Sequence, residues 1–487
     1  MARTVTDRAS GRPTSGRPTS LLWFRRDLRL TDHPALLAAI EDGEVLPVVC
    51  PDDAALAAGE LPRLRWTAAA RSLSEDIAAQ GGRLVVAAGD PEHALARLAA
   101  RVGAQRVHVT RETDPPAAAR DARVRERLAA DGVELVGTGT PYAVGPGLVM
   151  TKQGTPYAVF TPFSRAWREH GWPGPAPAPS TPPWAAVPDD ALSDGEALSD
   201  GELPSVDDPR IDPATLGERA ALDRLGTFLA DDLARYADER DRPDLDTTSR
   251  LSVPLRHGEI HPRTILAAID EATAGWRDVR ADAAEKFVTE LAWREFSADV
   301  LHHDPVSAWE DLKGTLLDLP YDNADEPAVA RRVDAWREGR TGYPIVDAGM
   351  RQLRDSGWMH NRVRMITASF LVKDLHVWWP VGARHFLDHL LDGDLASNNH
   401  GWQWVAGTGT DASPFFRVFN PTLQGTKLDP SGEYVRRWVP ELAHVRGKGV
   451  HTPWKTDGAY DEGYPRPIVD HDLERREALA RYEATRR

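Results

Sequence analysis

The segment from Asp392 to Asp411 has the composition of a pocket for a large planar molecule. It contains adjacent asparagines at 398 and 399, two tryptophans separated by one residue, and four glycines. Asparagine and aspartate favour caps and turns over helix interiors, and a buried indole N–H needs a partner. This composition is not typical of a plain core helix. It favours hydrogen bonding to a planar ligand, with aromatic rings leading to and from it.

A second candidate site lies between Asp246 and Ser252, a segment that follows Tyr236. Hydroxyl side chains here surround Arg250. Hydroxyls, backbone N–H groups and a guanidinium together suit a pyrophosphate. An ordinary capping turn has the same composition, so the segment alone leaves both interpretations open.

The segment 287–296 has a helical pattern that carries Glu290, Trp293 and Arg294 close together. Glu290 and Arg294 have the i,i+4 spacing of a helical ion pair. The alternative is a binding face, in which Trp293 stacks on an inserted base and Glu290 hydrogen-bonds its edge.

A further run, Thr341–Leu353, continues into Gly357–Phe370. Together with residues 392–411, these runs resemble the photolyase/cryptochrome family, specifically its class I cyclobutane pyrimidine dimer photolyases. The resemblance is collinear from about Tyr236 to Trp454 and weaker towards the N-terminus. It implies light-driven repair of UV-damaged DNA, with electron transfer from excited, reduced FAD to a flipped-out dimer. The alternatives are a cryptochrome-like blue-light photoreceptor, a (6-4) photoproduct repair enzyme and, least favoured, a plain flavin oxidoreductase.

The resemblance also assigns residues to the flavin site. It implies that Asp392 pairs with Arg364 beside the isoalloxazine ring and that Asn398 lies near the flavin N5. Photolyases resemble one another in having asparagine there, whereas plant cryptochromes tend to have aspartate, so Asn398 favours repair. The implied cofactor-binding residues are Tyr236, Thr248, Ser249, Arg250, Leu251, Ser252, Asn361, Arg364, Asp392, Gly393, Asp394 and Asn398.

The same resemblance implies a face that binds DNA. Glu290 would meet the carbonyl and N–H edge of the dimer as a catalytic residue, and Trp293 and Trp404 would sandwich the flipped bases. Flipping is expected because chemistry on a base requires extrusion from the stack. The implied DNA-binding residues are Arg240, Trp293, Arg294, Asn361, Arg362, Met365, Trp404, Arg417 and Gln424, with Lys427 near them.

An electron relay from the surface to the flavin is implied by tryptophan positions. Trp402 and Trp379 match two members of the family's triad. The surface member has no clean match, and Tyr321 is the nearest candidate, while Trp336 matches a different position. With Glu290 and Asn398, the three relay residues complete the predicted catalytic group. His360 belongs to the same motif, with a structural and a functional role equally open.

The N-terminal part must supply a scaffold of alternating strands and helices. Short apolar runs alternate with helical patterns, which predicts βαβ units and a Rossmann-like parallel sheet. No G-x-G-x-x-G follows a strand, so a nicotinamide site is not expected. The expected strands are 21–24, 45–50, 84–87, 106–110 and 133–136, and the expected helices are 35–41, 64–80, 92–102 and 117–130.

Two loops of this part follow strands at the edge where ligands of parallel sheets bind. The loop Arg25–Arg29 is highly charged, and we expect it to be solvated and salt-bridged rather than a ligand site. Glu112 and Asp114 follow the fourth strand, where the resembled family places its antenna chromophore. Their pattern resembles the 8-hydroxy-5-deazaflavin type more than the methenyltetrahydrofolate type, and an empty pocket is the other alternative.

The remainder reads as an all-α domain. We expect a disordered tail over 1–20, an α/β antenna domain over 21–150, an interdomain linker over 151–215 and a helical FAD- and DNA-binding domain over 216–487. The linker contains a tandem six-residue repeat, 191–196 and 197–202, typical of a tolerated insertion. The expected helices are 220–235, 263–274, 283–301, 329–337, 345–355, 362–372 and 384–391.

Composition sets outer limits on function. The net charge is −15, but residues 180–246 alone contribute −12, so a basic groove elsewhere is compatible with it. Cys50 is the only cysteine, which excludes an internal disulfide. His385 and His389 have an i,i+4 spacing without a third ligand, so no metal is predicted. We expect a cytoplasmic location, because no secretory signal and no membrane-spanning apolar run occurs. We also expect the chain to be a monomer.

Overall fold

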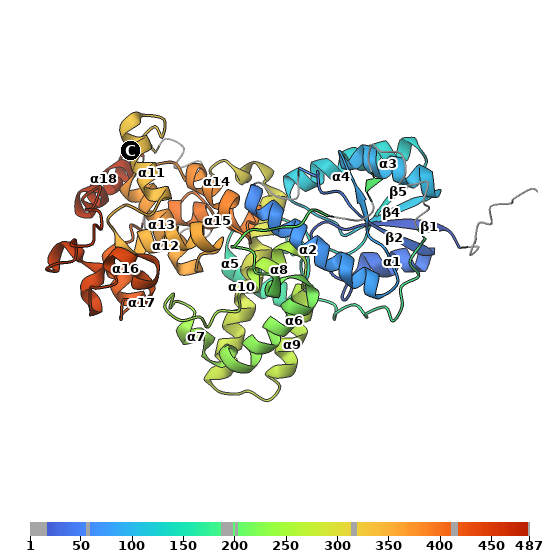
Figure 1. Cartoon of the computed structure of the whole chain (residues 1–487), viewed down its shortest axis with the longest axis horizontal. Helices are drawn as coiled ribbons and strands as arrows, with labels where there is room; N and C mark the ends of the chain where they lie inside the picture. The colour runs from blue at the N-terminus through green and yellow to red at the C-terminus, as the bar shows by residue number, and fades with distance from the viewer. Residues whose placement is uncertain are drawn as a thin grey trace, which may run out of the picture.

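The computed structural model describes residues 17–54, 59–186, 203–312, 319–410 and 417–485, and the backbone of 198–199. It has two parts: an α/β domain, which includes β1, β2, β4 and β5 in Figure 1, and a larger helical domain that extends away from it. The two-part architecture expected from the sequence is confirmed. Residues 1–16, the repeat at 191–202 except for the backbone of 198–199, and Asp411 lie outside the described residues.

The α/β domain is built on a six-stranded sheet with the order β5-β4-β1-β2-β3-β6. The five expected strands are present and parallel, and β6 is an additional antiparallel edge strand beside β3. The chain enters β1 at Thr19. The strands are β1 (Thr19–Trp23), β2 (Glu44–Val49), β3 (Val85–Ala87), β4 (Arg106–Val109), β5 (Glu134–Gly137) and β6 (Leu198–Ser199).

Both faces of this sheet are covered, which explains its continuous apolar strands. Leu21 and Trp23 point to one face, where they join residues of α3 and α4 in a core cluster. Leu22 and Phe24 point to the other face and pack with residues of α1 and α2. Figure 1 shows these two helix pairs on opposite sides of the strands. The helices are α1 (Pro34–Asp42), α2 (Glu60–Ala79), α3 (Pro91–Val102) and α4 (Pro115–Ala130).

The described residues after 203 form helices and no strand, so the expected all-α domain is confirmed. No described helix has both the length and the apolar character needed to cross a membrane. Short helical turns continue α6 and α13 at 228–235 and 370–374. The helices are α6 (Gly217–Thr227), α7 (Tyr236–Glu239), α8 (Ser252–His257), α9 (Pro262–Ala272), α10 (Val279–His303), α11 (Pro327–Arg337), α12 (Pro344–Ser356), α13 (Asn361–Ser369), α14 (Trp379–His389), α15 (Leu395–Ala406), α16 (Pro421–Leu428), α17 (Glu433–Trp438) and α18 (His471–Ala484).

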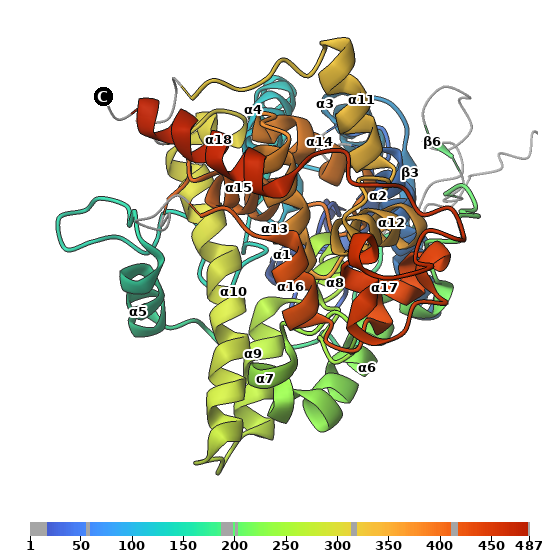
Figure 2. The same ribbon diagram turned by 90° about the vertical axis from the view of Figure 1, so that its left-hand side faces the viewer.

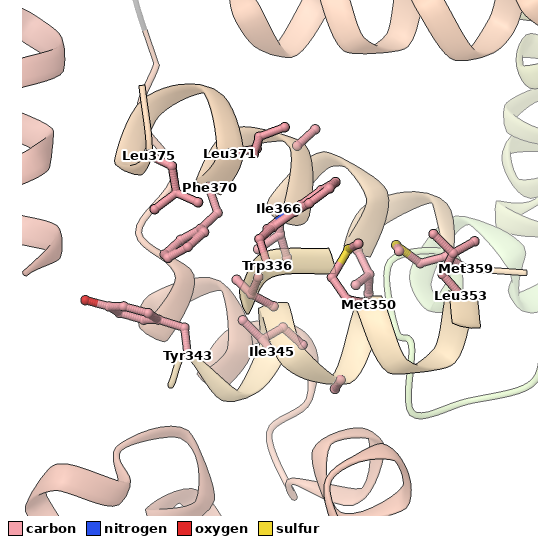
Figure 3. Packing of buried hydrophobic residues seen from close by; sticks show 14 of the residues in the cluster. Trp336, Tyr343, Ile345, Met350, Leu353, Met359, Ile366, Phe370, Leu371 and Leu375 are labelled. Carbon is pink, nitrogen blue, oxygen red and sulfur yellow. The ribbon is translucent and has the colours of Figure 1, made fainter. Parts of the chain in front are cut away.

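A large apolar core fixes α12 and α13 against each other, as Figure 3 shows. Tyr343, Ile345 and Met350 from α12 and the residue before it meet Ile366 and Phe370 from α13 and its continuation. These residues are almost fully buried. The rigid pair carries the polar residues 358–364 at the start of α13.

The segment 392–411 differs from the sequence-based expectation, because most of it is the helix α15. Asp394 caps this helix by accepting a hydrogen bond from the Ser397 N–H at 2.9 Å. The side chain of Gln403 donates to the Ser307 carbonyl at 2.7 Å and accepts from the Leu312 N–H at 3.0 Å. Polar residues are tolerated inside α15 because the distant segment 307–312 supplies their partners.

The expected linker contains a docked helix, α5 (Phe160–His170), which lies beside α10 in Figure 2. Trp167 of α5 donates its indole N–H to Glu295 of α10 at 2.9 Å. The same carboxylate accepts from the backbone N–H groups of Ala143, Val144 and Gly145. The first part of the interdomain segment is therefore an ordered part of the helical domain.

Candidate active site

The expected ion pair between Arg364 and Asp392 is present. Arg364 Nη2 donates to Asp392 Oδ2 at 2.9 Å, and its Nε donates to the Met359 carbonyl at 2.8 Å. The other carboxylate oxygen, Asp392 Oδ1, is buried and has no hydrogen-bond partner in the described residues. Such an atom is costly to leave unpaired. It fits a group that accepts a hydrogen bond from a ligand.

Asn398 lies on the first turns of α15, half-buried. Its Nδ2 donates to the Ala383 carbonyl at 3.0 Å and to Asn399 Oδ1 at 2.8 Å. Both hydrogen bonds are donated, so the orientation of the amide is set by α14 and by its neighbour. The carbonyl of Gly393, another residue predicted to bind the cofactor, accepts a hydrogen bond from Arg256 Nε at 2.7 Å.

Two buried donors at the start of α13 were not assigned to a ligand from the sequence. The Trp358 indole N–H and His360 Nε2 have no partner in the described part of the chain. His360 Nδ1 accepts from the Arg362 N–H at 3.2 Å and thereby caps α13, which leaves the proton on Nε2. The pKa of His360 is lowered to about 4, mainly by burial; Asp241 opposes this shift, and Arg250, Arg364 and Arg362 contribute to it.

Arg250 joins these donors from the segment 246–252. Its guanidinium lies 3.6 Å from the centre of the Trp358 ring, and it pairs with Asp246 at 2.8 Å. The φ of Arg250 is 56°, a left-handed conformation that side chains other than glycine rarely adopt. Strained backbone of this kind is concentrated at binding sites. The capping-turn interpretation alone does not account for it.

The other residues of this segment form the surroundings of Arg250. The carbonyls of Thr248 and Ser249 accept hydrogen bonds from Arg224. Ser249 Oγ accepts from the Leu251 N–H at 3.3 Å, and Ser252 begins α8. Tyr236 is buried against Phe287 and Phe228 rather than beside these hydroxyls.

The helical ion pair considered for Glu290 and Arg294 is not formed. Glu290 instead accepts from Arg240, fifty positions earlier in the chain. Arg294 donates to the Pro141 carbonyl at 2.9 Å and lies 4.5 Å from the centre of the Tyr142 ring. The sequence could not show this, because both partners come from distant segments.

Other residues predicted to contact DNA lie on several helices. Arg362 pairs with Asp241 at 2.8 Å, and its other nitrogen approaches the Met365 sulfur at 3.5 Å. Asn361 is exposed at the start of α13, and Trp293 is half-buried on α10. The remaining three are the half-buried Trp404 on α15, the exposed Arg417, and the half-buried Gln424 on α16. No contact joins Trp404 to Trp293 within the described residues, so the sandwich stays a prediction.

Two predicted relay residues are buried tryptophans. The indole N–H of Trp402 on α15 has no partner in the part of the chain that the structure describes, and its ring contacts Phe386 edge-to-face at 4.9 Å. A Cβ on Gly382 would lie 2.2 Å from the Trp402 ring, so the glycine permits this close packing. Trp379 donates to Asp311 at 2.6 Å.

Two further aromatic residues are candidates for the surface end of the relay. Tyr321 is half-buried and its hydroxyl has no hydrogen-bond partner among the described residues; burial, with a contribution from Asp311, raises its pKa. Trp378 is 40% exposed, and its ring centre lies 6.4 Å from that of Trp379. The sequence analysis did not single out Trp378, although its adjacency to Trp379 was a visible signal.

The antenna candidates Glu112 and Asp114 form ion pairs inside the protein. Arg26 pairs with both, and Arg120 donates to Glu112 at 2.6 Å. Burial alone would raise the pKa of Glu112, but Arg26, Arg120 and Arg25 hold it well below its usual value. The expectation of a solvated loop at 25–29 is wrong, because Arg25, Arg26, Asp27 and Arg29 are buried by the helical domain and by α4 residues. The expected salt bridges are present.

A small cavity adjoins this network between the two domains. Thr113, Asp114 and Tyr142 line one side, and Ala298 and Leu395 line the other. Arg26 also lies 4.0 Å from Asp394, the cap of α15. The ion-pair network of Glu112 and Asp114 is therefore linked through Arg26 to the turn before α15.

Comparison with known proteins agrees with this geometry. Residues 287–484 match the family described as the FAD binding domain of DNA photolyase, and residues 20–183 match the family described as DNA photolyase. A deoxyribodipyrimidine photo-lyase of Streptomyces griseus is 42% identical over 96% of this chain and 99% of its own length.

Two solved structures have the same fold over nearly the whole chain. A class III photolyase from Agrobacterium tumefaciens is 38% identical, with a TM-score of 0.87, over 98% of this chain and 100% of that one. A cryptochrome from Synechocystis is 28% identical, with a TM-score of 0.83, over 95% of this chain and 99% of that one. This chain belongs to the photolyase/cryptochrome family and carries its FAD-binding domain.

Proposed function

We propose that this chain is a deoxyribodipyrimidine photo-lyase that repairs cyclobutane pyrimidine dimers in DNA under blue or near-ultraviolet light. The observation that carries the proposal is a set of buried polar atoms on Asp392, Trp358 and His360 that have no hydrogen-bond partner among the described residues and lie beside the Arg364–Asp392 pair. These atoms fit a polar planar cofactor. Full-length relatives with the same activity in their names support the same conclusion.

FAD would be held by residues of α13, α15 and the segment 246–252. Asp392 Oδ1 would accept a hydrogen bond from FAD, and the Trp358 indole N–H and His360 Nε2–H would donate hydrogen bonds to it. Arg250 would lie beside the phosphates of FAD. Reduced FAD, once bound and excited, supplies an electron that splits the cyclobutane ring and is then returned. Asp392 keeps Arg364 in place as a fixed positive charge, and Asn398 presents a neutral amide that is oriented by α14.

The DNA face would be formed by the residues around Glu290. Arg240 orients the Glu290 carboxylate, which would meet the N–H edge of the inserted dimer. Trp293 supplies a stacking face, and a damaged pair is easier to extrude than an intact one. Arg362 and Arg417 would contact phosphates, so binding should weaken with salt.

We retain five further predictions from the sequence. They are membership of class I, an 8-hydroxy-5-deazaflavin antenna beside Glu112 and Asp114, a monomeric state, a cytoplasmic location, and domain boundaries near 21, 151 and 216. One of the solved relatives described above is a class III photolyase, so the class assignment stays a prediction. The antenna would be identified by the absorbance spectrum of the protein purified from its own host.

The decisive experiment is repair of an oligonucleotide that contains a single thymine dimer. Protein loaded with FAD and chemically reduced is incubated with it in blue light and in darkness. Loss of dimers in light alone establishes the proposal. A protein that binds FAD and dimer DNA but repairs nothing in light is not a photo-lyase, and the cryptochrome-like photoreceptor becomes the better interpretation.

A further inference from the structure

The side chains of Phe160 and Trp293 form a stacked pair between the interdomain segment and α10. Their ring centres are 3.5 Å apart and their planes differ by 7°. Phe160 is 8% exposed, whereas Trp293 is half-buried. Phe296 approaches Trp293 edge-on at 5.8 Å. Among the described residues, no aromatic side chain other than Phe160 is stacked face-to-face on the indole.

The stacking is imposed by the docking of α5. Free aromatic pairs prefer offset or edge-to-face geometry over a face-to-face sandwich, so the packing of the helix must hold these rings together. Phe160, Phe163 and Trp167 are the buried aromatics of α5. Trp167 is fixed by its hydrogen bond to Glu295, which lies two residues after Trp293 on α10.

Glu295 of α10 holds both the helix α5 and the segment 143–145 in place. It is 4% exposed and accepts hydrogen bonds from the Trp167 indole and from three backbone N–H groups of the segment 143–145. The position of α5 along α10 is therefore tied to a buried carboxylate through the Trp167 indole N–H. A shift of α5 along α10 would leave this buried N–H unpaired, which is costly.

We propose that Phe160 is a positioning residue for recognition of the dimer, with the interdomain helix α5 forming the back of the lesion-stacking surface. By covering one face of the Trp293 indole, Phe160 holds the ring in a single orientation and leaves the opposite face for a flipped pyrimidine. A side chain that is already ordered loses less conformational entropy when the base stacks on it. This inference rests on the proposed role of Trp293 in DNA repair.

The test measures binding to a dimer-containing oligonucleotide and to the same undamaged oligonucleotide, using the FAD-loaded protein. Phe160→Leu removes the stacked ring and keeps the apolar volume. We expect dimer affinity to fall about three- to ten-fold, as for the loss of one preorganised side chain, with affinity for undamaged DNA unchanged. Phe160→Tyr retains the stacked ring and should retain the dimer affinity. Phe160→Met replaces Phe160→Leu if the latter does not retain FAD.

Phe163→Leu is the matched control, because Phe163 is buried on the same helix and contacts Phe296, not Trp293. An equal loss of dimer affinity in Phe163→Leu overturns the inference, since it shows a general effect of α5 packing. So does a Phe160→Leu variant that loses affinity for both DNAs equally.

A double substitution separates this inference from the proposed function. In a Trp293→Ala background, Phe160→Leu should have no further effect on dimer affinity, and a persisting effect overturns the inference. If Trp293→Ala weakens dimer binding and Phe160→Leu does not, the inference fails while the role of Trp293 stands. If Trp293→Ala binds the dimer normally, the proposed role of Trp293 fails, and the inference fails with it.

Discussion

Arg364 and Asp392 form an ion pair in which only one carboxylate oxygen is used. Arg364 Nη2 donates to Asp392 Oδ2 at 2.9 Å, while Oδ1 is buried and unpartnered in the described residues. The pair thus joins α13 to the turn before α15. It combines a fixed cation with an acceptor that a bound cofactor can satisfy.

Asp392→Asn should weaken FAD binding by about ten- to a hundred-fold, since a hydrogen bond to a charged group contributes about 1.5–3 kcal/mol. Titration of apoprotein with FAD, followed by flavin fluorescence, measures the change. Asp355→Asn removes an exposed carboxylate paired with Arg354 and is the control. Unchanged FAD affinity in Asp392→Asn would exclude Asp392 from the cofactor site.

Glu290→Gln tests the catalytic role of that carboxylate. We expect repair per absorbed photon to fall about ten-fold at saturating DNA, because an amide oxygen accepts a weaker hydrogen bond from the N–H edge of the dimer than a carboxylate held by Arg240, so the dimer is positioned less well. The measurement is dimer loss against light dose. Glu285 lies on the same helix and pairs with Arg168, so the Glu285→Gln variant is the control and should repair normally. Normal repair by Glu290→Gln would remove Glu290 from the catalytic group.

The relay can be separated from repair. Trp402→Phe and Trp379→Phe should slow photoreduction of oxidised, bound FAD by more than about ten-fold, because phenylalanine is much harder to oxidise than tryptophan. Repair after chemical reduction should persist. Absorbance during illumination with an external reductant gives the rate.

The surface end of the relay has two candidates, Tyr321 and Trp378. Tyr321→Phe should slow photoreduction if the sequence-based assignment is right. Trp378→Phe is the comparison, since its ring is exposed and 6.4 Å from Trp379. Slow photoreduction in Trp378→Phe alone would transfer the role to Trp378.

The buried His261 should make the unfolding free energy of the protein depend on pH in the acid range. Its pKa is lowered to about 4, mainly by burial; the hydrogen bond with Asp32 opposes this shift and Arg29 contributes to it. An unfolded histidine has a pKa of about 6.5, so the unfolded state binds more protons between these values. His261 therefore lowers the unfolding free energy as pH falls from about 6.5 to 4, by up to about 1.4 kcal/mol per pH unit.

His261→Asn removes this titration and keeps a residue that can cap α9. Urea unfolding at pH 7, 6 and 5 should show a shallower pH dependence than the unsubstituted chain. His93→Asn changes an exposed histidine and should leave the dependence unchanged. Equal slopes for all three proteins would contradict the prediction.

The buried ion pairs of Glu112 with Arg26 and Arg120 should contribute to the stability of the fold. Glu112→Gln leaves Arg26 and Arg120 with less compensating charge in a buried position, and we expect a loss of about 3 kcal/mol in unfolding free energy. Glu134→Gln removes an exposed partner of Arg106 and should cost less than about 1 kcal/mol. Urea unfolding compares them. Similar losses in both would show that the network is not stabilising.

The sequence determined the two-part architecture. Apolar strands separated by helical patterns predicted the parallel sheet and most of its element positions, because local periodicity reflects which faces are buried. The helical half was predicted on the same basis. The runs 341–370 and 392–411 contain Arg364 and Asp392, whose expected ion pair is present.

Tertiary structure alone decided which residues meet across long distances in the chain. The polar side chains of α15 suggested turns, but Gln403 finds its partners in the segment 307–312. Glu290 pairs with Arg240 instead of its helical neighbour, and Phe160 of the expected linker stacks on Trp293. The charges of 25–29 suggested solvent exposure, yet carboxylates from α4 and from the loop between β4 and α4 pair with Arg25 and Arg26. Such partners lie far apart in sequence, and local patterns carry no information about them.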